Sequence, residues 1–222
     1  MKKISLLLLA VMSVWAADNK VYLNQTGSSG TVTITQTGSG NNVGSAATAA
    51  IMTGNTNTVT ISQIGNTNSM TLSMLGPGTN SYTYSATGNN NAMTFACGGT
   101  GSSDKCDNNT FNTTITSNNN TMNITANGEH ITNTLNFSGG DGNTVTMNLT
   151  SSNATNSITN VGAQNTYTVT QTGVAGVNGH ALTINSNGSG NTFGITQGGT
   201  IDTTVNISNV GSNNAFTIAT HN

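Results

Sequence analysis

Apolar and polar residues alternate in short stretches of this chain, and the same stretch recurs along its length. Each copy has an Asn, a small residue, and an apolar–polar–apolar triplet, as in NTVTI at 57–61 and NAMTF at 91–95. Alternation with a period of two predicts strands with one buried face, so Val59 and Ile61 are expected to point inward. The clear copies begin at Asn57, Asn68, Asn80, Asn91, Asn120, Asn133, Asn143, Asn165, Asn191 and Asn214.

The spacing of the copies predicts how the strands are connected. Neighbouring copies, such as those at Asn57, Asn68 and Asn80, are evenly spaced and separated by Gly- and Asn-rich turn sequences. One strand and one turn therefore take about 11 residues. Two such units make one rung of about 22 residues, and parallel strands of stacked rungs lie about 4.8 Å apart. The wider step from Asn91 to Asn109 predicts an insertion at a turn near 97–108. The fold class predicted is therefore an all-β solenoid of about seven strand–turn–strand rungs.

Two other fold classes fit the pattern less well. No stretch keeps helical apolar spacing for three turns, and Gly, Asn and Thr are poor residues for helix interiors. A β-sandwich of the immunoglobulin kind also has short, regularly spaced strands, and it is the main rival. A sandwich does not need self-similar strands, however, so the repeated unit favours the solenoid.

Composition supports a narrow core. Only 33% of the residues are apolar, 5% are charged and one is proline. Thr, Asn, Ser and Gly make up most of the rest, and this mixture suits strands joined by tight turns. A core held between two strands needs few apolar residues per rung.

The first residues resemble an export signal. Lys2 and Lys3 precede an apolar run from Ile4 to Val14, and Ala16 suits signal peptidase. This pattern predicts a signal peptide at 1–16, a repeat solenoid at 17–222, and a secreted, extracellular or cell-surface location without membrane insertion. The run is shorter than a membrane span, although a retained N-terminal anchor is the alternative.

Charge and cysteines narrow the function further. After cleavage, Lys20 and Lys105 would face six carboxylates, giving a net formal charge of −4, which argues against nucleic acid or anionic lipid as a partner. Cys97 and Cys106 flank a Gly- and Ser-rich stretch, and in an exported protein they are expected to form a local disulfide. The alternative, half of a metal site, lacks a nearby His or third Cys.

Several copies carry an additional glutamine motif. The spacing Gln-x-Gly-x-x-Asn is complete at Gln36–Asn41 and Gln63–Asn68, and it is partial at Gln25, Gln171 and Gln197. The motif resembles the repeat of curlin, the subunit of bacterial curli amyloid fibres. The resemblance covers the N-terminal third and two C-terminal patches.

The resemblance implies extracellular fibre formation, biofilm matrix and cell adhesion, with the chain itself as partner and a nucleator or another surface protein as a further partner. Stacked amides of the Gln and Asn residues are expected to form polar ladders. Independently, the strand sequences near both ends leave little room for caps. Val21, Leu23, Phe216 and Ile218 are therefore expected to form open edges for head-to-tail polymerisation.

Catalytic and metal sites are not expected. His130, His180 and His221 are separated and suit solvated turns, the six acids are scattered, and the chain after residue 16 has no arginine. Polysaccharide hydrolysis needs paired carboxylates, so we expect neither an enzyme nor a cofactor. GGDGN at 139–143 is similar to calcium-binding turns but occurs once, which favours a plain turn.

Two other functions stay open. Outward Thr-x-Thr pairs resemble the surfaces of β-solenoid ice-binding proteins; they occur at Thr31/Thr33, Thr58/Thr60, Thr144/Thr146 and Thr166/Thr168. A phage or cell-surface adhesin module that does not polymerise is the other alternative.

Overall fold

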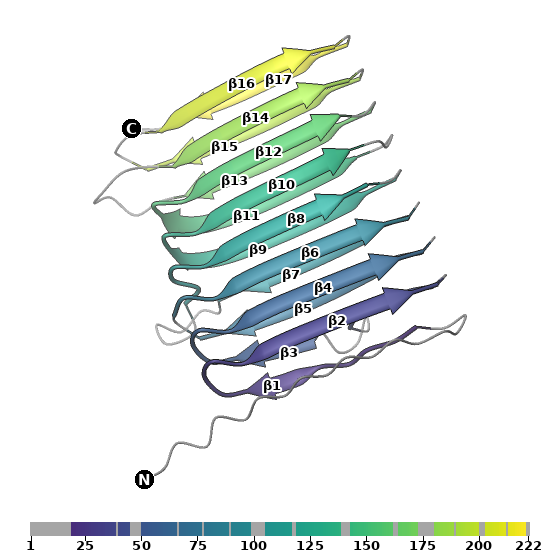
Figure 1. Cartoon of the computed structure of the whole chain (residues 1–222). Helices are drawn as coiled ribbons and strands as arrows, with labels where there is room; N and C mark the ends of the chain where they lie inside the picture. Colours follow the sequence, from purple (N-terminus) through teal and green to yellow (C-terminus); the bar gives the residue numbers. More distant parts are fainter. Residues whose placement is uncertain are drawn as a thin grey trace.

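The chain folds into two parallel β-sheets stacked face to face, and it passes from one sheet to the other at every turn (Figure 1). The computed structural model describes residues 19–38, 40–44, 50–65, 67–76, 78–88, 90–98, 105–116, 119–138, 143–161, 164–172, 180–188, 190–199, 203–211 and 213–220. This architecture confirms the predicted all-β solenoid. The described part contains no helix that is long and apolar enough to span a membrane.

The odd-numbered strands form a nine-stranded sheet. Its members are β1 (Asn24–Thr26), β3 (Ala50–Thr53), β5 (Ser69–Leu75), β7 (Ala92–Cys97), β9 (Thr121–Glu129), β11 (Thr144–Ser152), β13 (Thr166–Thr172), β15 (Thr192–Gly198) and β17 (Ala215–Thr220). Within the described residues, regular strand structure begins at Asn24, so the strand expected at Val21–Leu23 starts later than predicted. Val21 and Leu23 nevertheless pack against the core.

The even-numbered strands form an eight-stranded sheet. Its members are β2 (Thr31–Thr37), β4 (Thr58–Ile64), β6 (Ser81–Thr87), β8 (Thr110–Ile115), β10 (Thr132–Ser138), β12 (Thr155–Val161), β14 (Ala181–Asn187) and β16 (Thr204–Val210). Sequence neighbours therefore lie in opposite sheets, and each strand pairs with the strand two further along the chain.

The rungs repeat in strict register. Thr58 pairs with Ser81, and Thr132 pairs with Thr155 at the same separation along the chain. Every paired position in a sheet thus joins equivalent residues of successive rungs. The observed rung length agrees with the prediction from the sequence.

Alternating burial follows from this register. In β4, Val59 and Ile61 are buried, whereas Thr58 and Thr60 lie on the outer side. The inward side chains of both sheets form one continuous core. Because the strands stack without offset, like side chains fall into columns, as in the stacked rings of Tyr167, Phe193 and Phe216.

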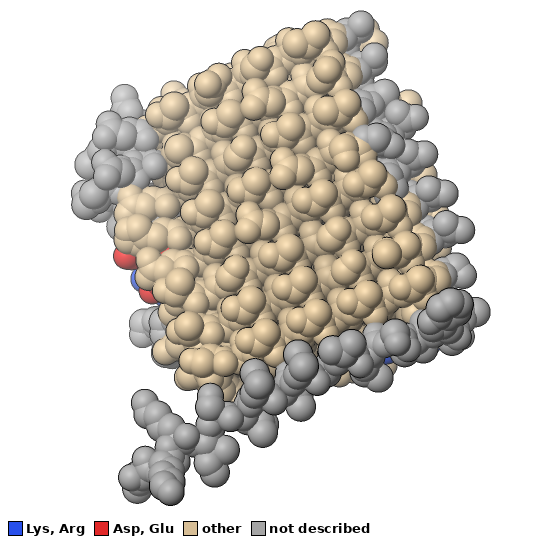
Figure 2. Space-filling model, viewed as in Figure 1, with Lys and Arg blue, Asp and Glu red and all other residues tan. Residues whose placement is uncertain are grey.

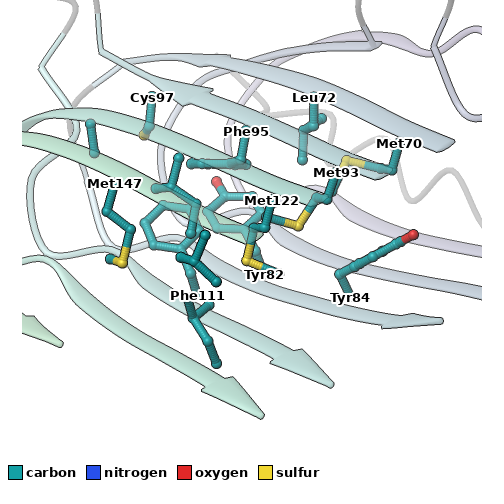
Figure 3. Close-up of a cluster of buried hydrophobic side chains, with 14 of the residues drawn as sticks. Met70, Leu72, Tyr82, Tyr84, Met93, Phe95, Cys97, Phe111, Met122 and Met147 are labelled. Atoms are coloured by element: carbon teal, nitrogen blue, oxygen red, sulfur yellow. The ribbon is translucent and has the colours of Figure 1, made fainter. Parts of the chain in front are cut away.

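The middle of the core is rich in aromatic and methionine side chains (Figure 3). The rings of Tyr82 and Phe111 stack with centroids 5.0 Å apart, and the ring of Phe95 from the opposite sheet tilts against both. Met93 and Met122 fill the space beside the rings. Flexible thioether side chains suit such irregular gaps.

Insertions are absorbed in the turns. Ser81 pairs with Thr110, which is a longer step along the chain than the step from Thr58 to Ser81. The difference arises because this rung contains the cysteine-flanked segment. The strands on either side keep their register despite the extra residues. The solenoid therefore tolerates long turns without a change in its core.

Candidate functional site

One column of buried asparagines runs along an edge of the solenoid, where the chain enters the nine-stranded sheet. We call it the first amide column, and it consists of Asn41, Asn68, Asn91, Asn120 and Asn143. Each side-chain Nδ2 donates to Oδ1 of the previous member: the distance is 2.5 Å for Asn68 to Asn41, and 2.7 Å for both Asn120 to Asn91 and Asn143 to Asn120. Asn91 donates to Asn68 in the same way. All five are at most 2% exposed.

A second amide column lies where the chain enters the eight-stranded sheet, and its bonds differ in kind. It consists of Asn57, Asn80 and Asn109. Here each Oδ1 accepts from a backbone N–H of the rung before: Gly30 to Asn57 at 2.9 Å, Asn57 to Asn80 at 2.7 Å and Asn80 to Asn109 at 3.1 Å. In the following rungs, the residues directly before the strands β10, β12 and β14 are Ile131, Ala154 and His180, so the amides of this column stop at Asn109.

Two glutamines form a shorter ladder inside the core. Nε2 of Gln63 donates to Oε1 of Gln36 at 2.8 Å. The same amide groups also donate to backbone carbonyls six residues later, at Asn42 and Ser69. The glutamines therefore join two rungs and also fasten the turn that follows each strand.

The remaining predicted glutamines lie differently. Gln171 and Gln197 are paired in register, but Oε1 of Gln171 accepts from Asn156, and Nε2 of Gln197 donates to the carbonyl of His180. Gln25 lies opposite Met52. Among the ladder residues chosen from the sequence, the structure therefore joins Gln36 to Gln63 and Asn41 to Asn68.

Sequence reasoning missed most of the amide network. Asn91, Asn120 and Asn143 continue the first column, and the Asn that opens each repeat was the available signal. Asn133 was less visible, because its motif looks like the others while the register places it inside β10. Its Nδ2 donates to Asn156 at 2.6 Å, and Asn156 in turn reaches Gln171 of the opposite sheet.

A disulfide closes the inserted segment. Cys97, at the end of β7, is joined to Cys106, with Cα atoms 5.5 Å apart. Both cysteines are buried, and Nδ2 of Asn109 donates to Sγ of Cys106. The turn is thereby tied to the last member of the second amide column.

Charged side chains gather near that turn. Lys105, Asp107 and Glu129 lie in or next to the turns on this edge, and the backbone N–H of Glu129 donates to Oδ1 of Asp107. Figure 2 shows red and blue atoms along this edge and none across the broad face turned toward the viewer. The face shown is thus left without ionic groups.

That face is the outer side of the eight-stranded sheet, and its side chains form rows in which most members carry a hydroxyl. One row follows the first position of each strand, and the next follows the third. The first row contains Thr31, Thr58, Ser81, Thr110, Thr132, Thr155, Ala181 and Thr204, and the second contains Thr33, Thr60, Thr83, Asn112, Thr134, Ser157, Thr183 and Asn206. We call this surface the hydroxyl face. The pairs Thr144/Thr146 and Thr166/Thr168 lie on the other sheet.

The two ends of the solenoid expose the core columns. Phe216 and Ile218 of β17 are 52% and 49% exposed, whereas Phe193 and Ile195 one rung below are each 1% exposed. Val205 and Ile207 of β16 are also only partly buried, as are Val21 and Leu23 at the other end. The apolar columns are therefore unfinished at both ends of the described chain.

The histidines do not assemble a site. His130 lies exposed in a turn, with Asn153 at 3.3 Å, and His221 is outside the described residues. The expectation of a solvated turn was wrong for His180, which is 2% exposed because it lies directly before β14, in line with the second amide column. In the part of the chain that the structure describes, no three His, Cys, Asp or Glu side chains lie close enough to hold a metal.

Part of the chain matches a known protein family. Residues 30–65 match the curlin associated repeat. No curated protein matches the chain, and no solved structure does. The matched residues run from the start of β2 to the end of β4, and they contain both the Gln36–Gln63 ladder and Asn41 of the first amide column. The chain therefore carries a curlin associated repeat in its first rungs.

Proposed function

We propose that this protein is an exported structural subunit that polymerises head to tail into an extracellular fibre or surface matrix, serving adhesion and biofilm formation. The observation that carries the proposal is the open end at β17. There, two large apolar side chains, Phe216 and Ile218, complete buried columns yet stay about half exposed. A nucleator or another surface protein would be a further partner.

Burial of these side chains favours stacking. Covering a Phe or Ile side chain contributes about 1.5–3 kcal/mol when burial is complete. The end strands β16 and β17 carry no Lys, Arg, Asp or Glu, and charges of that kind are what edge strands commonly use against association. A second copy would supply both the apolar cover and the missing backbone partners.

The amide columns support the same function. They run along the stacking direction, as the Asn and Gln ladders of cross-β fibres do. A column of this kind gains bonds with each added rung, because each new Asn satisfies the one before it. The curlin associated repeat is also typical of extracellular fibre subunits, which agrees with the export signal read from the sequence.

Seeded fibre growth tests the proposal. The gene is expressed for export, the mature N-terminus is read by mass spectrometry, and assembly from denaturant is followed by thioflavin-T fluorescence and electron microscopy. Unbranched fibres that seed further growth are expected. The variant Ile218→Lys should abolish growth, because it places a charge in the stacking surface.

Thr217→Lys is the matched control, because it adds the same charge to the same strand on the outer face. It should assemble much more readily than Ile218→Lys. A stable monomeric β-solenoid without fibres would overturn the proposal, as would equal assembly of the two lysine variants.

The hydroxyl face favours a second candidate function, ice binding. Its rows repeat about 4.8 Å between strands and about 6.7 Å along them. A flat, uncharged, two-dimensionally regular array of methyl and hydroxyl groups can hold ordered water against a crystal surface. This function depends on the regularity of the face.

Thermal hysteresis and ice recrystallisation assays test this candidate. Thr83→Tyr disrupts the middle of the hydroxyl face, whereas Thr94→Tyr places the same side chain at the equivalent exposed position on the opposite sheet. Ice binding through the hydroxyl face requires that only the first variant loses activity. A chain with neither fibres nor ice activity would next be tested for glycan binding, the activity expected of the non-polymerising adhesin module.

A further inference from the structure

The described strands are odd in number, and this determines how two ends can meet. The nine-stranded sheet contains both the first strand, β1, and the last strand, β17. Because the chain changes sheet at every turn, each end forms a step (Figure 1). At both ends the protruding strand belongs to the nine-stranded sheet.

We propose that successive copies in the fibre are turned by half a turn about the fibre axis, so that the nine-stranded sheet of one copy continues as the eight-stranded sheet of the next. β17 would then pair with β2 of the following copy, and β16 would pair with the segment 19–26 that contains β1. This inference rests on the proposed function, because it describes the contact by which copies stack.

Stacking without rotation leaves a gap. It would place β1 of the next copy directly on β17, with the two protruding strands in the same sheet. In the other sheet, β16 and β2 would then lie about two strand spacings apart, roughly 9.6 Å, instead of one. The backbone groups of both strands would face a vacant strand position, and unpaired buried backbone groups are costly.

The half turn removes the gap and keeps the strands parallel. Strands of the two sheets run in opposite directions, because tight turns join them. Turning a copy by half a turn reverses strand direction and exchanges the positions of the two sheets at once. β2 therefore meets β17 as a parallel neighbour, as β4 meets β2 within the chain.

The side chains match across both halves of this contact. The register between two copies follows from the residue directly before each strand. Gly30 precedes β2 as Asn214 precedes β17, so these two residues would lie opposite each other. Gln25, Met52 and Met74 are paired in one sheet. Asn19 precedes Gln25 by six residues, just as Asn68 of the first amide column precedes Met74, so Asn19 and Asn68 are equivalent positions. The inward pairs expected are Phe216–Val32, Ile218–Ile34, Thr220–Gln36, Val205–Val21, Ile207–Leu23 and Asn209–Gln25.

Disulfide trapping between copies tests the arrangement. Thr217→Cys copies are mixed with Thr33→Cys copies, assembled into fibres, oxidised and analysed by non-reducing gel and peptide mass spectrometry. The half turn makes these positions direct outer-face neighbours, about 4.8 Å apart between Cα atoms. A second mixture pairs Thr217→Cys with Tyr22→Cys, which would be neighbours without rotation, and a control mixture uses Thr83→Cys from the middle of the solenoid.

The expected result is at least about tenfold more Thr217–Thr33 cross-link than control cross-link, because neighbouring strands bring Cα atoms within disulfide range. Fibres that instead trap Thr217–Tyr22 would overturn the half turn while leaving polymerisation intact. Fibres that trap neither pair above the control would also overturn it. Failure to form any fibre would overturn the proposed function and this contact together.

Discussion

The hydroxyl of Tyr84 donates a hydrogen bond to Oε1 of Gln63, with 2.7 Å between the oxygens. In the following rung, the residue paired with Gln63 is Ala86, which has no side-chain amide to extend the glutamine ladder. Tyr84, two residues earlier on the same strand, reaches into the vacancy. The ladder thus ends with its last carbonyl satisfied.

Removing this hydroxyl should destabilise the protein. Tyr84→Phe leaves the buried Gln63 carbonyl without that donor, and the expected loss is about 1–3 kcal/mol of unfolding free energy. Denaturant unfolding followed by circular dichroism measures it. Tyr82→Phe is the matched control, since its hydroxyl is buried without a hydrogen-bond partner in the described structure. It should be neutral or slightly stabilising, and equal losses in the two variants would contradict the assigned role.

The first amide column should be sensitive at its centre. Asn120→Ala removes the bond that Asn120 donates to Asn91 and the bond that it accepts from Asn143. We expect a loss of about 1–3 kcal/mol for each group left unsatisfied. Asn123→Ala changes the same residue type on the exposed face of the same strand, and it should change stability by no more than about 0.5 kcal/mol. Similar unfolding midpoints for the two variants would show that the first amide column does not contribute to the stability of the fold.

The turn after β4 of the eight-stranded sheet requires glycine. Gly65 has φ of +147°, and a Cβ there would lie 1.5 Å from the carbonyl oxygen of Gly38 in the rung below. Gly65→Ala must therefore push two backbones apart, and we expect a loss of more than about 1 kcal/mol. Gly194→Ala, where the nearest atom is 4.0 Å away, should be neutral or stabilising. Thermal unfolding of both variants measures the two changes in stability, and equal changes would contradict the need for glycine at position 65.

Alkaline pH should weaken the fold through buried tyrosines. Burial raises the pKa of Tyr82, Tyr84 and Tyr167 well above their ordinary value, and the neighbouring polar side chains of Ser186 and Asn160 only partly oppose this at Tyr167. The folded state therefore keeps these protons, while the unfolded chain releases them near pH 10. Stability should be constant below about pH 10 and fall as pH rises beyond it.

Unfolding curves at a series of alkaline pH values, with tyrosinate absorbance as a second readout, measure this decline. Tyr82→Phe has one fewer buried phenol and should show a shallower decline. An unchanged slope in that variant would contradict the contribution of Tyr82.

The fold could be predicted from the sequence because its main signals are local. Alternation within each short repeat marks a strand, and Gly and Asn mark each turn, so strand, turn and rung length all followed. The amide network could not be predicted as fully. Asn57 and Asn68 look like equivalent copies, yet they lie at opposite edges and bond differently, one to backbone N–H groups and the other to side chains.

Other features depend on which rungs are adjacent. Tyr84 completes the glutamine ladder only because β6 stacks on β4 in a particular register. Asn133 becomes a core residue and His180 a buried residue for the same reason. Such relationships join residues that lie far apart along the chain, and the turns between them vary in length.

The stacking of many residues into each thin rung has a mechanical consequence. Each rung adds about 4.8 Å of height, but its roughly 23 residues would span about 80 Å if pulled straight. When the two ends are pulled apart, each rung that unfolds would therefore lengthen the chain by a large amount. Because a rung touches only its neighbours, unravelling would proceed from an end, one rung at a time. Under load, such a body would yield in steps and absorb work before it breaks.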